Sequence, residues 1–337
     1  MPRIRAAVGK TFSHPVVIAV LAAVLGALIA WRANIVAAGS DANQLLAGAR
    51  YLMHGVNPYT HVGPGLASPW PWPLYYPVPA LIIEMPFALL RDNVARIVFT
   101  ALSSGLLGFA VARTGYHRLI LFASPTFFNA AERTQLAPLL MAAALWPALG
   151  FVYAAKPNIG AALWAAKPSR IAALGSTVLI AVSFALQPTW LTDWLHASPM
   201  SPHLRPAVLY PFGWLLLLAA FGWRRRDARL LLFFSLIPQT LAEYAALPLF
   251  LVTKTRREAL VLLVGTAAVT LYVHAFHAEP TDMAYIASSG RAMVLTCFLP
   301  CLVMVLRRSP DRPSLREGDL DEGAVSADHA PVGVGLE

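Results

Sequence analysis

Long apolar segments separated by short polar clusters recur along almost the whole chain. The first, Val16–Trp31, precedes a polar stretch rich in proline, glycine and tryptophan, Asn34–Tyr75. Most later apolar segments end at lysine or arginine clusters. Because lipid offers no hydrogen bonds, backbone groups inside such segments must pair within helices. The pattern therefore predicts an all-α, polytopic membrane protein whose first outer loop carries an amphipathic surface helix.

Several apolar segments are shorter than the ~20 residues that a helix needs to cross the hydrocarbon. Between Arg229 and Lys254 there is too little chain for two crossings, and Pro238 lies in the middle. A similar interruption falls at Lys156-Pro157-Asn158. We expect broken or re-entrant helices at both places, with plain proline kinks as the alternative. We also expect Pro77–Leu90 to lie along the outer surface or to be re-entrant. The total is about ten to twelve transmembrane or re-entrant helices.

Composition supports the membrane assignment. Of the 337 residues, 58% are hydrophobic and 13% charged, whereas about a quarter of a soluble domain is charged. The net charge of +9 is spread over clusters between apolar segments, which is typical of cytoplasmic loops and not of a nucleic-acid-binding surface. Cys297 and Cys301 lie in an apolar run at helical spacing, and we expect small core residues without a metal site.

The positive clusters also predict topology. Arg3, Arg5 and Lys10 place the N-terminus in the cytoplasm, so the first helix leads to an outer loop at Asn34–Tyr75. Arg307 and Arg308 close the last span on the cytoplasmic side. We therefore expect a transmembrane domain over residues 1–308, and a disordered cytoplasmic tail over 309–337 because that segment is polar, acidic and glycine-rich.

Asp41 is the only carboxylate of the outer stretch Asn34–Tyr75. A lone acid at the foot of a membrane helix, on the side away from the positive N-terminus, suggests chemistry at the membrane surface. The alternative is a helix N-cap, because aspartate often accepts a backbone N–H at that position.

Four motifs in consistent order, over about residues 15–170, carry a resemblance to a known family. They are Asp41 with Gly48-Ala49-Arg50, Gly55 and Pro58-Tyr59; Tyr75-Tyr76-Pro77-Val78-Pro79 with Pro86-Phe87; Ser124-Pro125 with Gln135 and Pro138-Leu139; and Lys156-Pro157-Asn158. The chain thereby resembles the C-type glycosyltransferases that use polyprenyl-phosphate sugars. The closest resemblance is to glycosyltransferase family 87, which includes bacterial mannosyltransferases of lipoglycan assembly.

The chain also departs from that family's pattern. Ala42 and Leu45 stand where the family usually has aromatic residues after the aspartate, and Thr134 replaces the glycine before Gln135. Near Pro238 the chain has Glu243-Tyr244 where the family often has a tryptophan or histidine before a tyrosine. These differences leave a different donor, a different acceptor or a loss of activity open.

The resemblance implies an inverting transfer of a sugar, with mannose as the first choice, from a polyprenyl-phosphate donor to a lipid or glycan acceptor. The reaction would take place on the outer face of a bacterial cytoplasmic (inner) membrane, with membrane lipids as neighbours and nucleic acid excluded as a partner. Asp41 would be the catalytic base that takes the proton of the acceptor hydroxyl. No second acid accompanies it, so we expect transfer without a metal or other cofactor.

The leaving phosphate needs cations to stabilise its growing charge. Lys156 and Arg50 are the assigned phosphate-binding residues; the remaining outer cations are Arg91, Arg96 and Arg133. Lys156 stands in an apolar setting, where a lysine usually has a partner, although a lysine reaching back to the interface is the alternative. A plain surface contact is the alternative for Arg50.

The substrate-binding candidates are Gln135, Tyr59, Tyr76 and Asn158. Gln135 would hydrogen-bond a sugar hydroxyl or merely cap a helix. Tyr59, Trp70 and Trp72 would stack on a sugar or prenyl chain, or simply anchor the membrane interface. Two other functions stay open for the whole chain: a transporter or flippase of lipid-linked saccharides, and a non-catalytic membrane scaffold. Internal repeats would favour the transporter, and the sequence shows none.

Overall fold

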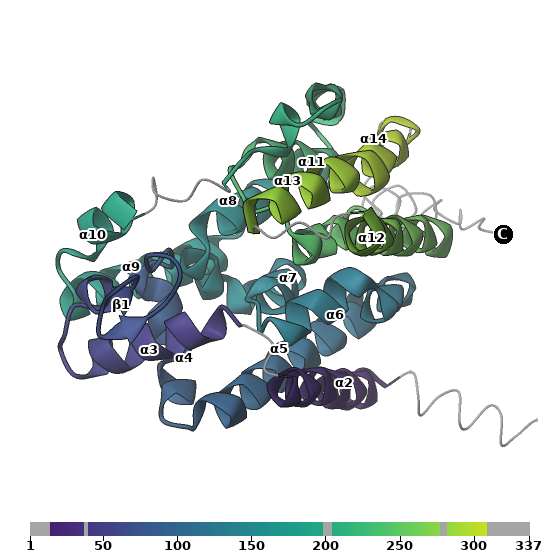
Figure 1. Ribbon diagram of the computed structural model, residues 1–337. Helices are drawn as coiled ribbons and strands as arrows, with labels where there is room; N and C mark the ends of the chain where they lie inside the picture. Colours follow the sequence, from purple (N-terminus) through teal and green to yellow (C-terminus); the bar gives the residue numbers. More distant parts are fainter. Residues whose placement is uncertain (1–13, 37–39, 198–203, 277–281, 309–337) are drawn as a thin grey trace, which may run out of the picture. The chain divides into compact units, whose positions relative to one another are not determined.

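The structure is a computed structural model that describes residues 14–36, 40–197, 204–276 and 282–308. These residues form helices joined by short connections (Figure 1). The α-helices are α2 (Pro15–Ile35), α3 (Ala42–Met53), α4 (Val78–Ala88), α5 (Asp92–Thr114), α6 (Pro125–Glu132), α7 (Ala137–Leu145), α8 (Pro157–Ala166), α9 (Arg170–Leu186), α10 (Trp190–Ala197), α11 (Arg226–Leu236), α12 (Arg256–Phe276), α13 (Asp282–Met293) and α14 (Leu299–Leu306).

Tighter helical turns and two very short strands complete the chain. The 3₁₀ segments are η1 (Pro58–Thr60), η2 (Tyr116–Ala123), η3 (Pro147–Ala155), η5 (Ala207–Leu209), η6 (Gly213–Gly222) and η7 (Glu243–Leu251). A π-helical turn, η8 (Val294–Phe298), joins α13 to α14. Strands β1 (Val62–Gly63) and β2 (Ser68–Pro69) pair in parallel, with Val62 opposite Ser68.

The predicted all-α, polytopic membrane architecture is confirmed. Within the described residues, four helical stretches are long and apolar enough to cross a membrane: α2, α5, α12 and the continuous stretch Ala284–Leu306. A fifth is added if α9 and α10, which meet at a bend of 98°, are counted as one span. The other apolar segments form helices shorter than the ~20 residues that a single straight crossing needs.

The first two long helices, α2 and α5, pack closely along their length (Figure 1). Their contact face consists of small residues, including Gly26 on α2 and Gly105 and Gly108 on α5. A Cβ atom at Gly108 would lie only 2.7 Å from the Cβ of Ala22. Small residues let two backbones approach and gain dispersion contacts where lipid provides no hydrophobic drive for association.

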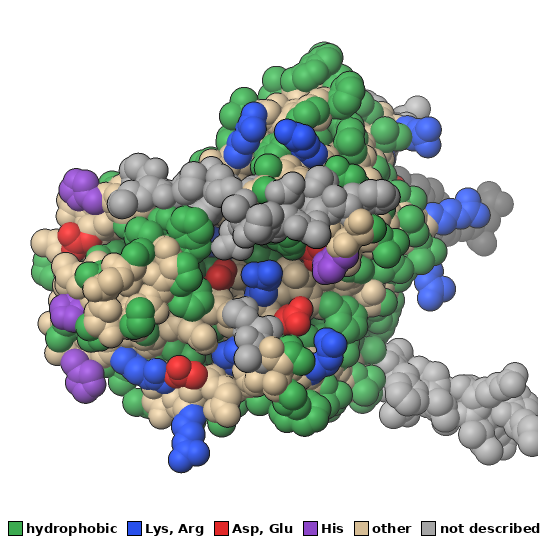
Figure 2. All heavy atoms as spheres, viewed as in Figure 1, with side chains coloured by type: hydrophobic (Ala, Val, Ile, Leu, Met, Phe, Trp, Pro, Cys, Tyr) green, Lys and Arg blue, Asp and Glu red, His purple; other side chains and the backbone are tan. Residues whose placement is uncertain are grey.

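The outer faces of the long helices are apolar. On α2, for example, the side chains of Val20 and Leu28 are each 55% exposed. Figure 2 shows hydrophobic side chains over much of the visible surface, with basic and acidic side chains both near its middle and around its edge. Extended exposed apolar surface of this kind marks contact with lipid or a partner, and the length of the helices favours lipid.

Both predicted helix interruptions are present. The helix η3 ends at Ala155 and α8 begins at Pro157, so Lys156 lies in the break. Likewise α11 ends at Leu236, and the chain is irregular through Pro238 until η7 begins. Proline at the first helical position explains the start of α8, because its missing N–H would be unpaired there in any case. The two breaks meet, because the side-chain amide of Asn158 donates to the carbonyl of Pro238.

The outer stretch is packed and not loose. On α3, Leu45, Leu46 and Leu52 are buried and face the interior, and this helix packs against α4. Eleven residues long, α4 is too short to cross the hydrocarbon, in agreement with a surface or re-entrant segment. The amphipathic pattern of α3 therefore anchors the loop to the helices beneath it.

Cys297 and Cys301 are both buried and unbridged, as expected of small core residues. The described elements belong to one compact unit, Met1–Arg307. The first 13 residues and residues 309–337 lie outside the described part of the chain. The disordered tail, the domain limit at 308 and the cytoplasmic position of the two ends therefore stay predictions.

Candidate functional site

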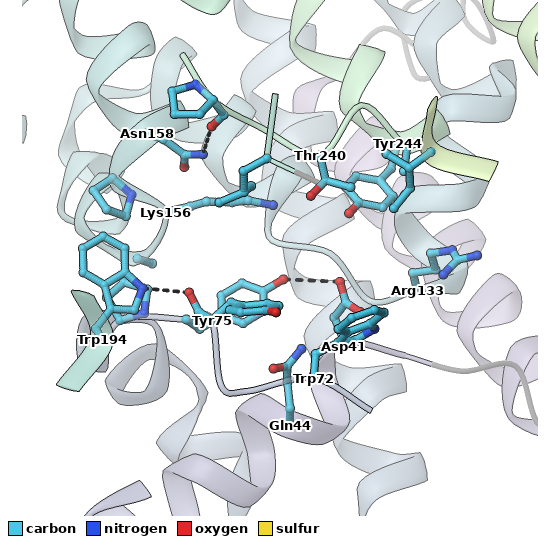
Figure 3. Close-up of a pocket in the computed structure, with 18 of the residues that line it drawn as sticks. Asp41, Gln44, Trp72, Tyr75, Arg133, Lys156, Asn158, Trp194, Thr240 and Tyr244 are labelled. Atoms are coloured by element: carbon cyan, nitrogen blue, oxygen red, sulfur yellow. Dashed lines mark hydrogen bonds between the residues drawn. The ribbon is translucent and has the colours of Figure 1, made fainter. Parts of the chain in front are cut away.

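A cavity of about 390 Å³ opens among the outer stretch, the two helix breaks and α10. Figure 3 shows many of its side chains converging from segments far apart in the sequence. The lining residues are Asp41 and Gln44 of the α3 start; Trp70, Trp72, Tyr75, Tyr76 and Pro77 before α4; Arg133 after α6; Ala155, Lys156, Pro157 and Asn158 at the first break; Trp194 and Leu195 of α10; Leu204, Pro238, Thr240, Ala242 and Tyr244 near the second break; and Tyr285 and Ile286 of α13.

Asp41 stands at the position before α3, but its side chain does not cap the helix. Its carboxylate oxygen Oδ2 accepts hydrogen bonds from Gln135 Nε2, at 2.5 Å, and from the hydroxyl of Tyr76, at 3.4 Å. The hydroxyl of Ser40 instead accepts the N–H of Ala42. The N-cap interpretation of Asp41 is therefore wrong, and the other carboxylate oxygen, Oδ1, has no partner among the described residues.

Gln135 reaches Asp41 because α6 ends in a specific turn. The N–H of Gln135 donates to the carbonyl of Ala130, and the N–H of Thr134 donates to that of Ala131. This pair of bonds is the Schellman C-terminal motif, which needs a left-handed residue at the position of Thr134. Thr134 has a φ of 53°, an uncommon conformation for a β-branched residue. The turn thus orients Gln135 at some conformational cost.

Arg133, in the same turn, also lines the cavity, and in Figure 3 its guanidinium points away from Asp41 and Lys156. Its carbonyl accepts a hydrogen bond of 2.9 Å from the hydroxyl of Ser40, which ties the end of α6 to the start of α3. The guanidinium of Arg133 makes no hydrogen bond or ion pair with any other described residue. Burial raises the pKa values of Glu243 and Tyr244 in η7, and the charge of Arg133 acts to lower them.

Lys156 enters the cavity from the break between η3 and α8 (Figure 3). Its ammonium lies 5.9 Å from the ring centre of Tyr76 and 5.6 Å from that of Tyr244. Both distances are within the range of a cation–π contact. In the described part of the chain it forms no ion pair. Burial lowers the pKa of Lys156, while the charge of Asp41 acts in the opposite direction.

Tyr76 contacts both Asp41 and Lys156. Its side chain is buried, and its ring lies beside the ammonium of Lys156 while its hydroxyl faces Asp41. Burial, and next the charge of Asp41, raises the pKa of Tyr76 well above its ordinary value. The hydroxyl therefore stays protonated at neutral pH and acts as a hydrogen-bond donor.

The remaining predicted residues are distributed between the cavity and the frame around it. Asn158 lines the cavity, and its amide donates to the carbonyl of Pro238 across the two breaks. The Tyr59 hydroxyl donates to the carbonyl of Tyr76, so Tyr59 supports the cavity wall and does not line it. Gln135 likewise acts through Asp41. Trp70 and Trp72 both line the cavity.

Arg50 does not line the cavity. Its guanidinium donates to the carbonyls of Ala88 and Leu90 at the end of α4, each at 3.0 Å, and pairs with Asp92 at the start of α5. These groups already satisfy its charge. Of the outer cations named as alternatives for the phosphate, Arg133 is the one that lines the cavity.

The other two outer cations are also elsewhere. Arg91 lies exposed immediately before α5, and Arg96 is buried, donating to the carbonyl of Glu132. Sequence reasoning also missed Gln44. It follows Asp41 by three residues, a spacing that puts both side chains on one face of a helix, so the pattern was available.

A comparison of the chain with protein-family models, with curated proteins and with solved structures found no match. The fold and cavity define a class: a multi-pass, all-α membrane protein with an aromatic-walled cavity that holds a fixed carboxylate and two cations, neither cation in an ion pair with another described residue.

Proposed function

We propose that the protein is an integral membrane glycosyltransferase. It would move a sugar, with mannose as the first choice, from a polyprenyl-phosphate donor to a lipid or glycan acceptor on the outer face of a bacterial cytoplasmic membrane. One observation carries the proposal: an oriented carboxylate with a free oxygen, Asp41, shares a cavity with two cations, Lys156 and Arg133, neither of which forms an ion pair with another described residue. A base and an anion-binding pair are what this transfer needs.

The proposed reaction is a single displacement. Asp41 Oδ1 takes the proton of the acceptor hydroxyl as its oxygen attacks the anomeric carbon of the donor. The bond between that carbon and the phosphate oxygen breaks, and the phosphate keeps the electron pair. The new glycosidic bond forms on the opposite face, so the configuration inverts. Asp41 afterwards returns its proton to water.

The cations have a defined task in this scheme. The donor phosphodiester carries one negative charge, and the departing polyprenyl phosphate gains a second as the bond breaks. Lys156 and Arg133 would stabilise that developing charge, and such fixed groups are most effective where they need not reorganise. Tyr76 and Gln135 would hold Asp41 through Oδ2, so that only Oδ1 points to the acceptor.

The lining of the cavity fits a sugar bound to a lipid. Trp70, Trp72 and Trp194 present apolar rings with one polar edge, which suit the apolar faces of sugar rings. The surrounding surface of α2, α9 and α12 is apolar and would remain in the bilayer with the prenyl chain. No second acid lines the cavity in the described residues, so transfer without a metal stays our expectation.

The test is transfer of radiolabelled mannose from polyprenyl-phosphate mannose to a lipid extract by membranes that contain the protein. The Asp41→Asn variant keeps the side-chain shape and removes the basicity. It should insert normally and bind donor, yet transfer at least about a hundredfold more slowly, which is the low end of the effect of a general base. Asp92→Asn, outside the cavity, is the matched control. Near-normal transfer by Asp41→Asn would overturn the proposal.

A further inference from the structure

Gln44 is a buried amide that faces the cavity without a protein partner. Its side chain is 5% exposed, and Figure 3 shows it rising from α3 toward Asp41. Its Oε1 atom is buried without a hydrogen bond, and its Nε2 atom has no partner among the described residues either. Burying an amide without a hydrogen-bond partner costs free energy. The position is therefore built for a group that the protein alone does not supply.

Gln44 and Asp41 form a pair on one helix face. They are three residues apart at the start of α3, so their side chains are neighbours. Asp41 is held through Oδ2 by Gln135 and Tyr76, which leaves Oδ1 toward the cavity. A ligand at this end thus meets one oxygen that only accepts hydrogen bonds, and beside it the Nε2 donor of Gln44, whose Oε1 is buried.

The two ends of the cavity differ in charge. Lys156 enters from the opposite wall, between the rings of Tyr76 and Tyr244, and suits an anion. Gln44 shares the other end with the carboxylate of Asp41 and the ring of Trp72 (Figure 3). The attacking hydroxyl must lie against Asp41 in the proposed reaction, so the rest of the acceptor extends over Gln44.

We infer that Asp41 and Gln44 form an acceptor subsite for a vicinal diol, the pair of adjacent hydroxyls found on a sugar ring or polyol. One hydroxyl is the nucleophile at Asp41, and its neighbour accepts a hydrogen bond from Nε2 of Gln44. The acceptor is therefore a glycan and not the single hydroxyl of a lipid alcohol. The inference rests on the proposed function for the role of the first hydroxyl, whereas recognition of the diol can be measured without transfer.

Binding is tested first, with probes that assume no particular sugar. Cis- and trans-cyclohexane-1,2-diol are titrated against cyclohexanol, using the fluorescence of the cavity tryptophans in the purified, full-length protein. At least one diol should bind about tenfold or more tightly than cyclohexanol, because a site with unpaired polar groups rejects a ligand that lacks the matching hydroxyl. Equal binding of diol and monoalcohol, or no binding of any probe, would overturn the inference.

The decisive variant is Gln44→Met, which keeps the length of the side chain and removes the amide. It should bind the diol only as well as cyclohexanol, with the affinity for cyclohexanol unchanged and the melting temperature not lowered. Gln187→Met, outside the cavity, is the matched control and should keep the preference. Retained preference in Gln44→Met, or an equal loss for all probes together with a lower melting temperature, would contradict the subsite.

Transfer distinguishes this inference from the proposed function. Octyl mannoside and octanol are offered as acceptors to the wild type and to Gln44→Met, with polyprenyl-phosphate mannose as donor. Wild type should use the glycoside at least about tenfold better, and the variant should lose that preference. Transfer with no such preference would sink the subsite and leave the proposed function standing. Diol binding without any transfer would sink the proposed function and leave the subsite.

Discussion

Arg50 and Lys156 are two cations that the sequence assigns to the same phosphate, and the structure gives them opposite surroundings. The guanidinium of Arg50 is held by two carbonyls at the end of α4 and by Asp92 at the start of α5. The ammonium of Lys156 has only the faces of two tyrosine rings. The charge of Arg50 is thus paired within the protein, whereas the charge of Lys156 has no ion-pair partner among the described residues.

The difference follows from what each segment of backbone leaves unpaired. At the end of α4 the last carbonyls lack helical partners and carry the negative end of the helix dipole, so a nearby arginine is stabilised there. At Lys156 the helix is interrupted, but the adjoining α8 begins with a proline that needs no N–H partner. Among the described residues Lys156 forms no ion pair, although the charge of Asp41 acts to raise its pKa. The number of partners therefore separates a cation that stabilises the fold from one that awaits a ligand.

The largest test of this comparison is Lys156→Met. Removing a preorganised cation that faces a developing charge typically costs about a hundredfold in rate. We expect that loss in transfer from polyprenyl-phosphate mannose, with protein level and melting temperature close to wild type, because no ion pair is broken. A parallel fall of protein level and activity would instead show that Lys156 is needed for folding.

The pH dependence of transfer should sharpen the same point. Burial lowers the pKa of Lys156, so the ammonium loses its proton at a lower pH than an ordinary lysine does. Transfer should therefore decline on the alkaline side by about tenfold per pH unit once that pKa is passed. Tyr76 cannot cause this decline, because its pKa is raised. In Lys156→Arg the decline should vanish, since arginine stays charged. A decline that persists unchanged would assign it to another group.

The opposite change, Arg50→Met, should act on stability and only slightly on transfer. It leaves two helix-end carbonyls and Asp92 without their donor. Because the Arg50 and Asp92 side chains are 38% and 53% exposed, the loss is limited to about 1 kcal/mol. Thermal unfolding in detergent should shift down by a few degrees, while transfer per folded molecule stays within a few-fold. A hundredfold loss of transfer at unchanged stability would return Arg50 to the phosphate site.

The sequence predicted the parts of this protein that depend on local pattern. The length of the apolar segments predicted the membrane helices, and the motif Lys156-Pro157-Asn158 predicted a helix break. Asp41 was chosen as a candidate site residue because it is the only carboxylate of its polar stretch. What local pattern did not contain is which groups would be paired. That Arg50 meets the end of α4 depends on how α4 folds back onto α3, and that Asp41 meets Gln135 depends on a turn 94 residues away.

Thr134 contributes both to the fold and to the cavity. It ends α6, and the turn that it forms places Gln135 against Asp41 and Arg133 in the cavity lining. A threonine at a φ of 53° costs roughly 1–2 kcal/mol relative to a right-handed conformation, and its hydroxyl is buried without a partner. Glycine adopts this conformation freely, although its larger freedom in the unfolded chain offsets part of the gain.

Thr134→Gly should therefore have the smallest effect on transfer and should raise stability by about 1 kcal/mol, seen as a melting temperature a few degrees higher in detergent. Thr134→Val is the matched control, because it keeps the branched, strained residue and removes only the hydroxyl. If Val stabilises as much as Gly, the unpaired hydroxyl and not the backbone is the source of the cost. If Gly instead lowers transfer sharply while stability rises, the rigidity of the threonine turn is itself needed to hold Gln135 against Asp41. The activity of the cavity would then depend on a strained backbone at Thr134 as well as on the cation Lys156.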